Sequence, residues 1–269
     1  MTRIADVLTA STLPALETRM LLMHALKKTR VELITHSDYI LSATELETVQ
    51  QLIRRRLAGE PVAYLLGERE FFGLMLHVTP DVLIPRPDSE LLVELALQRA
   101  PVNSCLLDLG TGSGALAIAL AHERADLQVW AGDISPGALA VAQSNARLHD
   151  CQIEFILSDW YAALPAMQWH TIVSNPPYIV QHDPHLTQGD LRYEPIDALT
   201  DHADGLSAYR LLLDGAGTRL LPGGWLLVEH GYHQAEDVRA LFACHPFEQI
   251  QSWRDLGGIE RVTGGQLIK

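Results

Sequence analysis

The segment 106–114 constrains what this chain can fold into more than any other part of it. Its sequence, LLDLGTGSG, joins an apolar run to three glycines at alternate positions, and the mostly apolar residues 115–121 follow at once. This order predicts a buried strand, a tight glycine turn and a helix. Glycine lets the backbone approach a ligand closely, and the first turn of a helix presents N–H groups. The segment therefore predicts a ligand-binding strand–turn–helix unit, with a plain strand-to-helix connection as the alternative.

An acidic residue follows this turn at the distance expected of a ribose-binding side chain. Asp133 comes directly after the segment 129–132, about 20 residues beyond the glycine turn, where an acid meets ribose hydroxyls in nucleotide-binding folds. Ser135 and Pro136 are typical of a helix N-cap and first helical residue, so Asp133 lies on the intervening loop. Because the glycine pattern is G-x-G-x-G and not the dinucleotide pattern G-x-G-x-x-G, we expect a compact adenosyl cofactor in place of NAD.

Apolar segments with strand or helix spacing alternate through most of the chain. Seven segments are expected to be strands, near 104–108, 128–132, 153–157, 171–174, 224–229, 247–251 and 259–268. Helices are expected between most of them, and Asp88 is placed to cap a helix over residues 89–99. This alternation predicts an α/β fold built on a doubly wound, largely parallel sheet.

The first part of the chain has the spacing of a small helical domain. Three of its segments show helical periodicity, at residues 4–10, 16–26 and 43–57. A hairpin formed by residues 70–78 and 82–84 is expected to lead out of this domain. We therefore divide the chain into a helical domain, residues 1–72, and a larger α/β domain, residues 73–269, which begins with the hairpin.

The tetrapeptide Asn175-Pro176-Pro177-Tyr178, which follows the strand expected at 171–174, suits chemistry on a planar nitrogen. The nitrogen of an amide or a nucleobase is a poor nucleophile because its lone pair is shared with a π system. The side-chain carbonyl of Asn175 and nearby main-chain carbonyls can accept its N–H hydrogens together. The prolines hold this backbone extended, and Tyr178 can pack against a flat substrate group. An ordinary Pro-Pro turn with a packed tyrosine is the alternative.

With both motifs present, the chain resembles the S-adenosylmethionine-dependent methyltransferases, and specifically the release-factor glutamine N5-methyltransferases (the HemK/PrmC family). The resemblance extends nearly end to end and rests on six segments, at residues 84–88, 108–114, 158–160, 174–178, 189–195 and 229–231. It implies a Rossmann-like sheet of seven strands, the last antiparallel, and S-adenosyl-L-methionine as cofactor. It also implies methyl transfer to the glutamine of the Gly-Gly-Gln motif in class 1 peptide chain release factors.

The resemblance also implies which residues carry the activity. The cofactor-binding residues it implies are Gly110, Thr111, Gly112, Ser113, Gly114, Asp133, Trp160 and Asn175. The substrate-binding residues are Asn175, Pro176, Pro177 and Tyr178, of which Asn175, Pro176 and Tyr178 are the catalytic ones. For some residues a structural role is also open: Trp160 either lies near adenine or belongs to the core, and Asp108 either holds the methionyl amine or caps a helix. Glu229 to Gly231 either orient the cofactor or end a strand, and Arg86 serves the substrate or its own loop.

Charge bears on the choice of substrate. The chain of 269 residues has 33 acidic and 20 basic side chains, a net charge of −13. Residues 1–72 are balanced, so the whole acidic surplus falls on the larger domain. Nonspecific nucleic-acid binding depends on neutralising phosphates, so we expect release factors as partners and no direct binding of duplex DNA. A nucleic-acid adenine N6-methyltransferase is the alternative enzyme, and a non-catalytic cofactor-binding module is the alternative from another class.

The remaining features predict a monomeric cytoplasmic protein without a membrane contact. No apolar run reaches the length of a transmembrane helix, and residues 1–6 lack the apolar core of a signal peptide. Cys105, Cys151 and Cys244 are too far apart for a C-x-x-C pair, so we expect no disulfide or zinc but reduced, mostly buried thiols. No metal is expected at His182 and His185 either. The tripeptide at 264–266 is itself Gly-Gly-Gln, which a final strand would hold in place.

Overall fold

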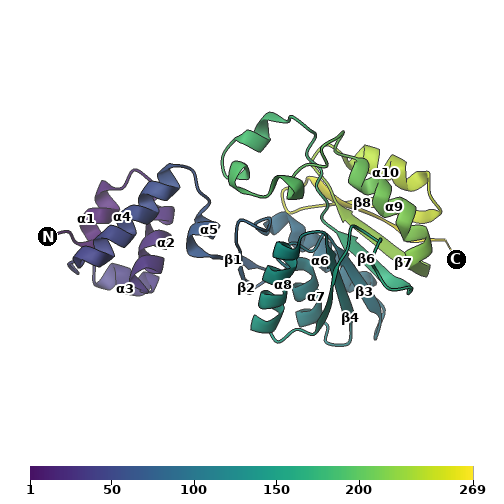
Figure 1. The fold of residues 1–269 in the computed structure, drawn as a ribbon, viewed down its shortest axis with the longest axis horizontal. Coiled ribbons are helices and arrows are strands. Elements are labelled where there is room, and N and C mark those ends of the chain that lie inside the picture. The colour runs from purple at the N-terminus through teal and green to yellow at the C-terminus, as the bar shows by residue number, and fades with distance from the viewer. Residues whose placement is uncertain (269) are drawn as a thin grey trace. The chain divides into compact units, whose positions relative to one another are not determined.

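The computed structural model describes residues 1–268, and Figure 1 shows the order of the helices and strands. The chain divides into two compact units between Glu68 and Arg69. The boundary between residues 72 and 73 that we expect from the sequence falls just after this division, in the turn of a hairpin.

Residues 1–68, all of which the structure describes, form a helical unit. Its helices are α1 (Ile4–Ala10), α2 (Ala15–Leu26), α3 (Arg30–Thr35), α4 (Ala43–Leu57) and α5 (Val62–Leu66). Thr29 and Ser42 open α3 and α4 with capping boxes, in which each exchanges hydrogen bonds with a glutamate at the third helical position. Ile4, Leu22 and Val49 are fully buried in the core of this unit. The sequence spacing did not predict α3 and α5, because so short a helix contains too few apolar positions to show a period.

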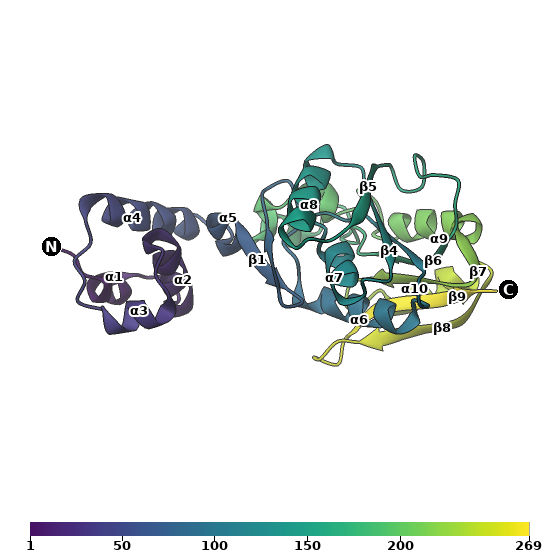
Figure 2. The ribbon, with the colours of Figure 1, turned by 90° about the horizontal axis from the view of Figure 1, so that it is seen from below.

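The second unit contains a seven-stranded sheet with the strand order β5-β4-β3-β6-β7-β9-β8 over its described residues. The strands are β3 (Cys105–Leu109), β4 (Gln128–Asp133), β5 (Ile153–Leu157), β6 (Trp169–Ser174), β7 (Leu220–Glu229), β8 (Phe247–Arg254) and β9 (Glu260–Leu267). The first five strands in this order, β5, β4, β3, β6 and β7, pair in parallel with their neighbours. Strand β9 runs antiparallel to both β7 and β8 (Figure 2). The expected α/β fold with a seven-stranded, largely parallel sheet is confirmed.

Helices cover both faces of this sheet. They are α6 (Glu90–Arg99), α7 (Ala115–Glu123), α8 (Pro136–Leu148), α9 (Ser207–Arg219) and α10 (Ala235–Ala243). Alternate strand residues supply two separate cores: Leu106 and Val173 pack with α6 and α7, and Leu107 and Ile172 pack with α9 and α10. The buried strands are apolar on both faces for this reason, as is typical of parallel sheets covered on both sides.

A short hairpin precedes the sheet, and here the expectation from the sequence was partly wrong. Its strands are β1 (Glu68–Phe71) and β2 (Leu74–His77), joined by Phe72 and Gly73, which both have positive φ as a two-residue hairpin turn requires. Residues 82–84, expected to be a strand, are loop. Val82 is apolar because the loop is buried and not because it pairs with a neighbouring strand.

Asp88 does not cap the helix that follows it, contrary to expectation. It lies in the 3-10 turn η1 (Pro87–Ser89), and its carboxylate forms an ion pair with Arg261 at 3.2 Å. Ser89 occupies the N-cap position of α6 without making a side-chain cap bond. The hydroxyl of Ser89 is therefore directed to other partners.

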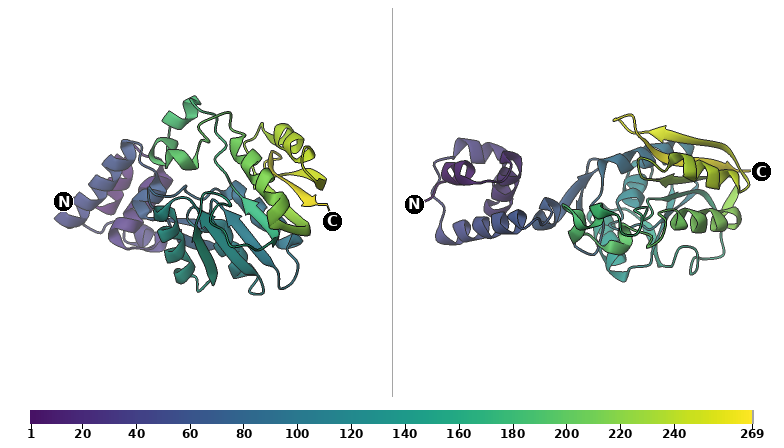
Figure 3. Two further views of the ribbon diagram at one scale, coloured as in Figure 1. Left: turned by 45° about the vertical axis from the view of Figure 1, so that its right-hand side comes forward. Right: turned by 90° about the horizontal axis from the view of Figure 1, so that it is seen from above.

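A long segment, residues 175–206, connects β6 to α9 and contains the 3-10 turns η2 (Pro184–Thr187), η3 (Leu191–Tyr193) and η4 (Ile196–Ala198). Figures 1 and 3 show this segment, coloured green, standing out from the sheet. A bridge between Ile179 and Thr200 closes it into a loop. It supplies part of the wall of the site described below.

Two smaller expectations concern the cysteines and the Gly-Gly-Gln tripeptide. The cysteines are free, but the expectation that most are buried was wrong: Cys244 is exposed, and Cys105 and Cys151 are half-buried. The Gly-Gly-Gln tripeptide lies inside β9, where Gly264 and Gly265 are buried and the side chain of Gln266 donates to the carbonyl of Gly223 at 2.7 Å.

Over residues 1–268, the structure contains no helix that combines the length and the apolar character needed to span a bilayer.

Candidate active site

A cavity of about 480 Å³ opens at the carboxyl ends of the parallel strands. Strands β3, β4 and β6 end at it, and the chain reverses its direction across the sheet between β3 and β6. Open α/β sheets bind their ligands at such a switch point. Two loops, at residues 81–86 and 195–202, complete the wall.

The glycine turn forms one side of the cavity. Gly110 and Gly112 have φ of +74° and +55°, a region that other residues adopt only with strain, and both line the cavity. The N–H groups of Gly110 and Thr111 donate to the carbonyl of Gly132, at 2.9 and 3.1 Å, which ties the turn to the end of β4. Gly114 lies behind the wall, where a Cβ atom would stand only 2.9 Å from the Ile118 side chain.

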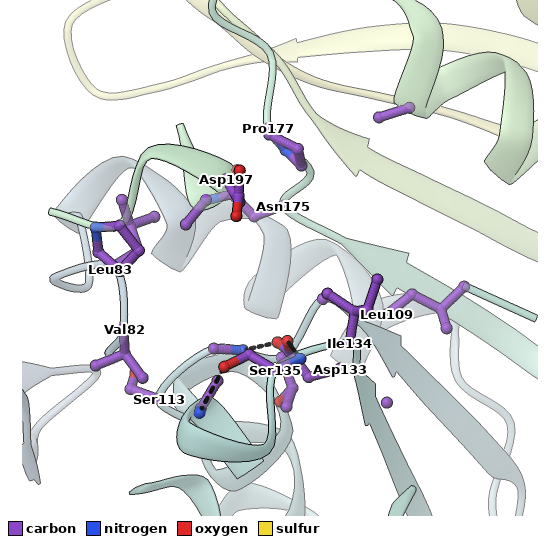
Figure 4. Close-up of a pocket in the computed structure, with 18 of the residues that line it drawn as sticks. Val82, Leu83, Leu109, Ser113, Asp133, Ile134, Ser135, Asn175, Pro177 and Asp197 are labelled. Atoms are coloured by element: carbon purple, nitrogen blue, oxygen red, sulfur yellow. Dashed lines mark hydrogen bonds between the residues drawn. The ribbon is translucent and has the colours of Figure 1, made fainter. Parts of the chain in front are cut away.

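Asp133 projects from the end of β4 into the same side of the cavity (Figure 4). One of its carboxylate oxygens accepts from the N–H of Gly112 and the other from that of Ser135, each at 2.9 Å. Burial raises the pKa of this carboxyl, while the N–H groups work against the rise. Each oxygen keeps a lone pair, so the carboxylate remains able to accept from two ligand hydroxyls.

Asp108 is fully buried beneath the turn and does not line the cavity. Its Oδ2 accepts from the hydroxyl of Thr111 at 2.7 Å, and its Oδ1 has no hydrogen-bond partner among the described residues. The carboxylate lies near the N–H of Ala117 in the first turn of α7, a position that favours the helix-capping role over contact with a ligand. Burial raises the pKa of Asp108 to about 7, and the neighbouring charge of Asp133 adds to the rise.

The Asn-Pro-Pro-Tyr corner forms the opposite side of the cavity. Asn175 and Pro177 line it, and Figure 4 shows them across the cavity from Asp133. Pro176 and Tyr178 lie behind this wall: Pro176 is buried, and Tyr178 packs against the core between the sheet and α9. The carbonyl of Tyr178 accepts from the side chain of Gln234 at 3.0 Å, which holds the end of the corner in place.

The orientation of the Asn175 amide follows from its hydrogen bond. Its Nδ2 donates to the hydroxyl oxygen of Ser89 at 3.2 Å. The side-chain carbonyl is therefore the polar group that Asn175 offers to a ligand, and it can accept from an incoming N–H.

Trp160 lines the cavity and also packs against the core beneath it, so both of the roles considered for it are compatible with its position. Its backbone has φ of +46°, and the Ser158 hydroxyl donates to its carbonyl at 2.8 Å. This bond fixes the loop after β5 against the cavity.

Several wall residues were not anticipated from the sequence. They are Val82 and Leu83, taken for a strand, and Asp197, Asp201 and His202 on the long segment. One signal was available in Glu194, a buried acid that accepts from the N–H of Ile84 at 3.0 Å and forms an ion pair with Arg86. This pair joins the two loops of the wall, so Arg86 serves its own loop, although it lines the cavity as well.

Of the residues proposed for the site, eight line one cavity: Gly110, Thr111, Gly112, Ser113, Asp133, Trp160, Asn175 and Pro177. Gly114, Pro176 and Tyr178 stand directly behind them. The functional roles implied for all eleven remain predictions. The arrangement itself places acceptors on one side of the cavity for a hydroxylated ligand and an amide carbonyl on the other.

Comparison with known proteins identifies this combination. Residues 1–67 match the model of the PrmC N-terminal domain, and residues 87–190 match that of the methyltransferase small domain. The release factor glutamine methyltransferase of Burkholderia pseudomallei is 52% identical over 98% of this chain and 95% of its own length. The corresponding proteins of Bordetella pertussis and Escherichia coli are 50% and 43% identical, over 99% and 96% of this chain and 100% and 94% of their own lengths.

Solved structures with lower identity share the fold. A methyltransferase from Pyrococcus furiosus superposes with a TM-score of 0.58 at 16% identity, over 80% of this chain and 98% of its own. A 16S rRNA N2 G1207 methyltransferase of T. thermophilus, solved with AdoMet and guanosine, superposes with a TM-score of 0.55 at 21% identity, over 74% and 49%. These likenesses support the methyltransferase sheet alone, whereas the full-length identity to curated relatives is specific: the chain belongs to the release factor glutamine methyltransferase family.

Proposed function

We propose that this chain transfers a methyl group from S-adenosyl-L-methionine to the side-chain nitrogen, N5, of the glutamine in the Gly-Gly-Gln motif of class 1 peptide chain release factors. The observation that carries the proposal is the amide of Asn175, which commits its Nδ2 to Ser89 and so offers a carbonyl oxygen to the cavity. A primary amide such as glutamine needs an acceptor of this kind. The named activity of relatives up to 52% identical agrees with this choice.

The residues present fit the cofactor. The cavity volume falls within the usual range of about 300–1,000 Å³ for small-molecule sites. Asp133 would accept from the ribose hydroxyls, the backbone of Gly110 and Gly112 would approach the cofactor closely, and Trp160 would lie against the adenine. When bound, S-adenosylmethionine supplies a methyl group made electrophilic by its positively charged sulfur.

The role we assign to the chain is positioning. Asn175 and the Pro176 carbonyl would accept the two hydrogens of the glutamine amide and hold its nitrogen in line with the methyl group. Tyr178, behind the corner, would keep the Pro-Pro backbone in place. The reaction needs no strong base, because an N-protonated amide is far more acidic than water and releases its proton readily.

An adenine N6-methyltransferase would need the same acceptors, so it is the second candidate. Two observations weigh against it: the acidic surplus of the larger unit, and the activity named for relatives over nearly the whole chain. Because release factors act in translation, we assign the reaction to the cytoplasm.

The test supplies labelled cofactor with a purified release factor in one tube and adenine-containing DNA in another. We expect label on the release factor only, in the peptide that contains its Gly-Gly-Gln motif. The Asn175→Ala variant should bind cofactor within a few-fold of the unsubstituted protein, and its turnover should fall by about 10²–10³-fold, the usual cost of removing one positioned hydrogen-bonding group. Asn103→Gly, an exposed turn residue outside the cavity, is the control and should change neither. Label confined to DNA would reject the proposal.

A further inference from the structure

Three polar side chains from distant parts of the chain meet at the cavity wall, which Asn175 and Ser89 line and behind which Glu229 lies. Asn175 follows β6, Ser89 ends η1 before α6, and Glu229 is the last residue of β7. Ser89 is 4% exposed and Glu229 is 2% exposed. The Asn175 Nδ2 donates to the Ser89 hydroxyl oxygen at 3.2 Å. Burial raises the pKa of the Glu229 carboxyl to about 7, and the nearby Ser89 hydroxyl works against that rise. The proposed function names Ser89 only as the hydrogen-bond partner of Asn175, and it gives no role to Glu229.

The chemistry of these three groups decides which of them donates a hydrogen and which accepts it. Above its raised pKa of about 7, Glu229 is ionised and its carboxylate can only accept, so the single hydrogen of the Ser89 hydroxyl is directed to Glu229. The hydroxyl oxygen is then left as an acceptor, and Asn175 must meet it with N–H and not with its carbonyl. An amide has nearly the same shape after a half-turn about its terminal bond, so shape alone does not select between the two orientations.

We infer that Ser89 and Glu229 are positioning residues that fix the amide orientation of Asn175, so that its carbonyl oxygen and not its NH2 group meets the substrate nitrogen. The inference rests on the proposed function, in which that carbonyl accepts an N–H of the glutamine amide. With the reverse orientation, Asn175 would present hydrogens to the hydrogens of the substrate. The bound amide would be repelled, and no methyl transfer would follow.

The surroundings support an arrangement held for orientation. In the described structure the Oε2 atom of Glu229 is buried and has no hydrogen-bond partner. Burying an acid in this way disfavours folding. Arg86 and Arg261 lie close enough to favour its charged form, whereas Asp88 opposes it. A side chain whose only task was to end β7 would not need a buried charge.

The experiment compares Ser89→Ala, Ser89→Thr and Glu229→Gln with the unsubstituted protein in the release-factor assay. Ser89→Ala removes the acceptor, and we expect kcat to fall about 10- to 100-fold while cofactor Kd stays within two-fold. Ser89→Thr keeps the hydroxyl and should retain kcat within about three-fold of the original. Glu229→Gln can accept from or donate to Ser89, so it no longer enforces one direction, and its kcat should fall between the other two. Equal kcat for Ser89→Ala and Ser89→Thr would overturn the inference.

A second measurement does not depend on the substrate. In ¹⁵N-resolved NMR spectra, the side-chain amide hydrogens of Asn175, assigned by their loss in Asn175→Asp, should exchange slowly with solvent. Protection should persist in Ser89→Thr and vanish in Ser89→Ala; protection that survives in Ser89→Ala would also overturn the inference. If the unsubstituted protein labels no release factor while this pattern holds, the proposed function fails and the orientation of Asn175 by Ser89 stands.

Discussion

Two glycines in one helix should respond to alanine in opposite directions. Gly215 and Gly217 both lie within α9, and neither has positive φ. A Cβ added to Gly217 meets nothing within 4 Å, and this residue is exposed. A Cβ added to Gly215 would lie 2.2 Å from two ring carbons of Tyr161. The Tyr161 hydroxyl donates to the carbonyl of Leu212 in the same helix at 2.9 Å, so the ring is held at both ends.

The magnitudes follow from these contacts. Alanine stabilises a helix interior over glycine by about 0.5–1 kcal/mol, so Gly217→Ala should raise Tm by about 1–4 °C for a unit of this size. Gly215→Ala has the same helical gain but must displace the ring by more than 1 Å, since ordinary contact begins near 3.4 Å. Overpacking costs about 1–3 kcal/mol, and loss of the tyrosine hydrogen bond costs about 1 kcal/mol more. We expect a net loss of about 1–3.5 kcal/mol and a Tm lower by about 2–14 °C.

Tryptophan fluorescence during thermal unfolding is a suitable assay, because all five tryptophans lie in the second unit. The Tyr161→Leu background supplies the control: without the ring, Gly215→Ala should no longer destabilise relative to that background. Tyr161 follows Trp160 directly, so Gly215→Ala should also weaken cofactor binding, whereas Gly217→Ala should not. A Tm raised equally by both alanines would refute the packing argument.

Two further predictions concern the turn and the buried acids. Gly114→Ala should lower Tm more than Gly258→Ala, because both have φ near +80° but only Gly114 lacks room for a Cβ, and overpacking adds about 1–3 kcal/mol; equal losses would contradict this. Burial raises the pKa of Asp108 and of Glu229 to about 7, so the folded chain keeps protons that the unfolded chain releases above about pH 4. The stabilisation from these bound protons is complete below about pH 4 and is lost as pH rises through 7. In denaturant titrations without cofactor, the free energy of unfolding of Asp108→Asn should therefore fall less steeply between pH 5 and 8 than that of the unsubstituted protein. Parallel curves for the two proteins would contradict this prediction.

The strands of the sheet were predictable because their apolar runs are long and bounded by turn signals. The segment 153–157 was placed correctly at both ends, and β6 and β7 were recognised with their first residues missed. The loop at 82–84 was mistaken for a strand because a buried loop and a buried strand have the same apolar composition. The spacing of apolar residues indicates which residues are buried. It does not indicate whether a buried segment pairs with a neighbouring strand or packs against the sheet as a loop.

The site was predictable where one local segment holds both the backbone geometry and the chemistry. The glycine turn and Asn175 are of this kind, since each lies directly after an apolar strand. Strand ends gather at one edge of a parallel sheet, so the acid Glu229, which ends the apolar run of β7, was a candidate for the same edge. Ser89 gave no such signal, because it is 86 positions from Asn175 in the sequence and sits at the start of a helix.

What decides the chemistry of Asn175 is therefore a relation that no single segment contains. The tetrapeptide supplies an amide at the cavity, but an amide presents either an acceptor or two donors, and only the residue that it meets on its other side selects between them. That residue comes from the start of α6, and the acid that orients its hydroxyl comes from the end of β7. A chain with the same tetrapeptide and an apolar residue at position 89 would have the motif, but nothing would fix the orientation of its Asn175 amide. The motif by itself therefore does not establish the activity.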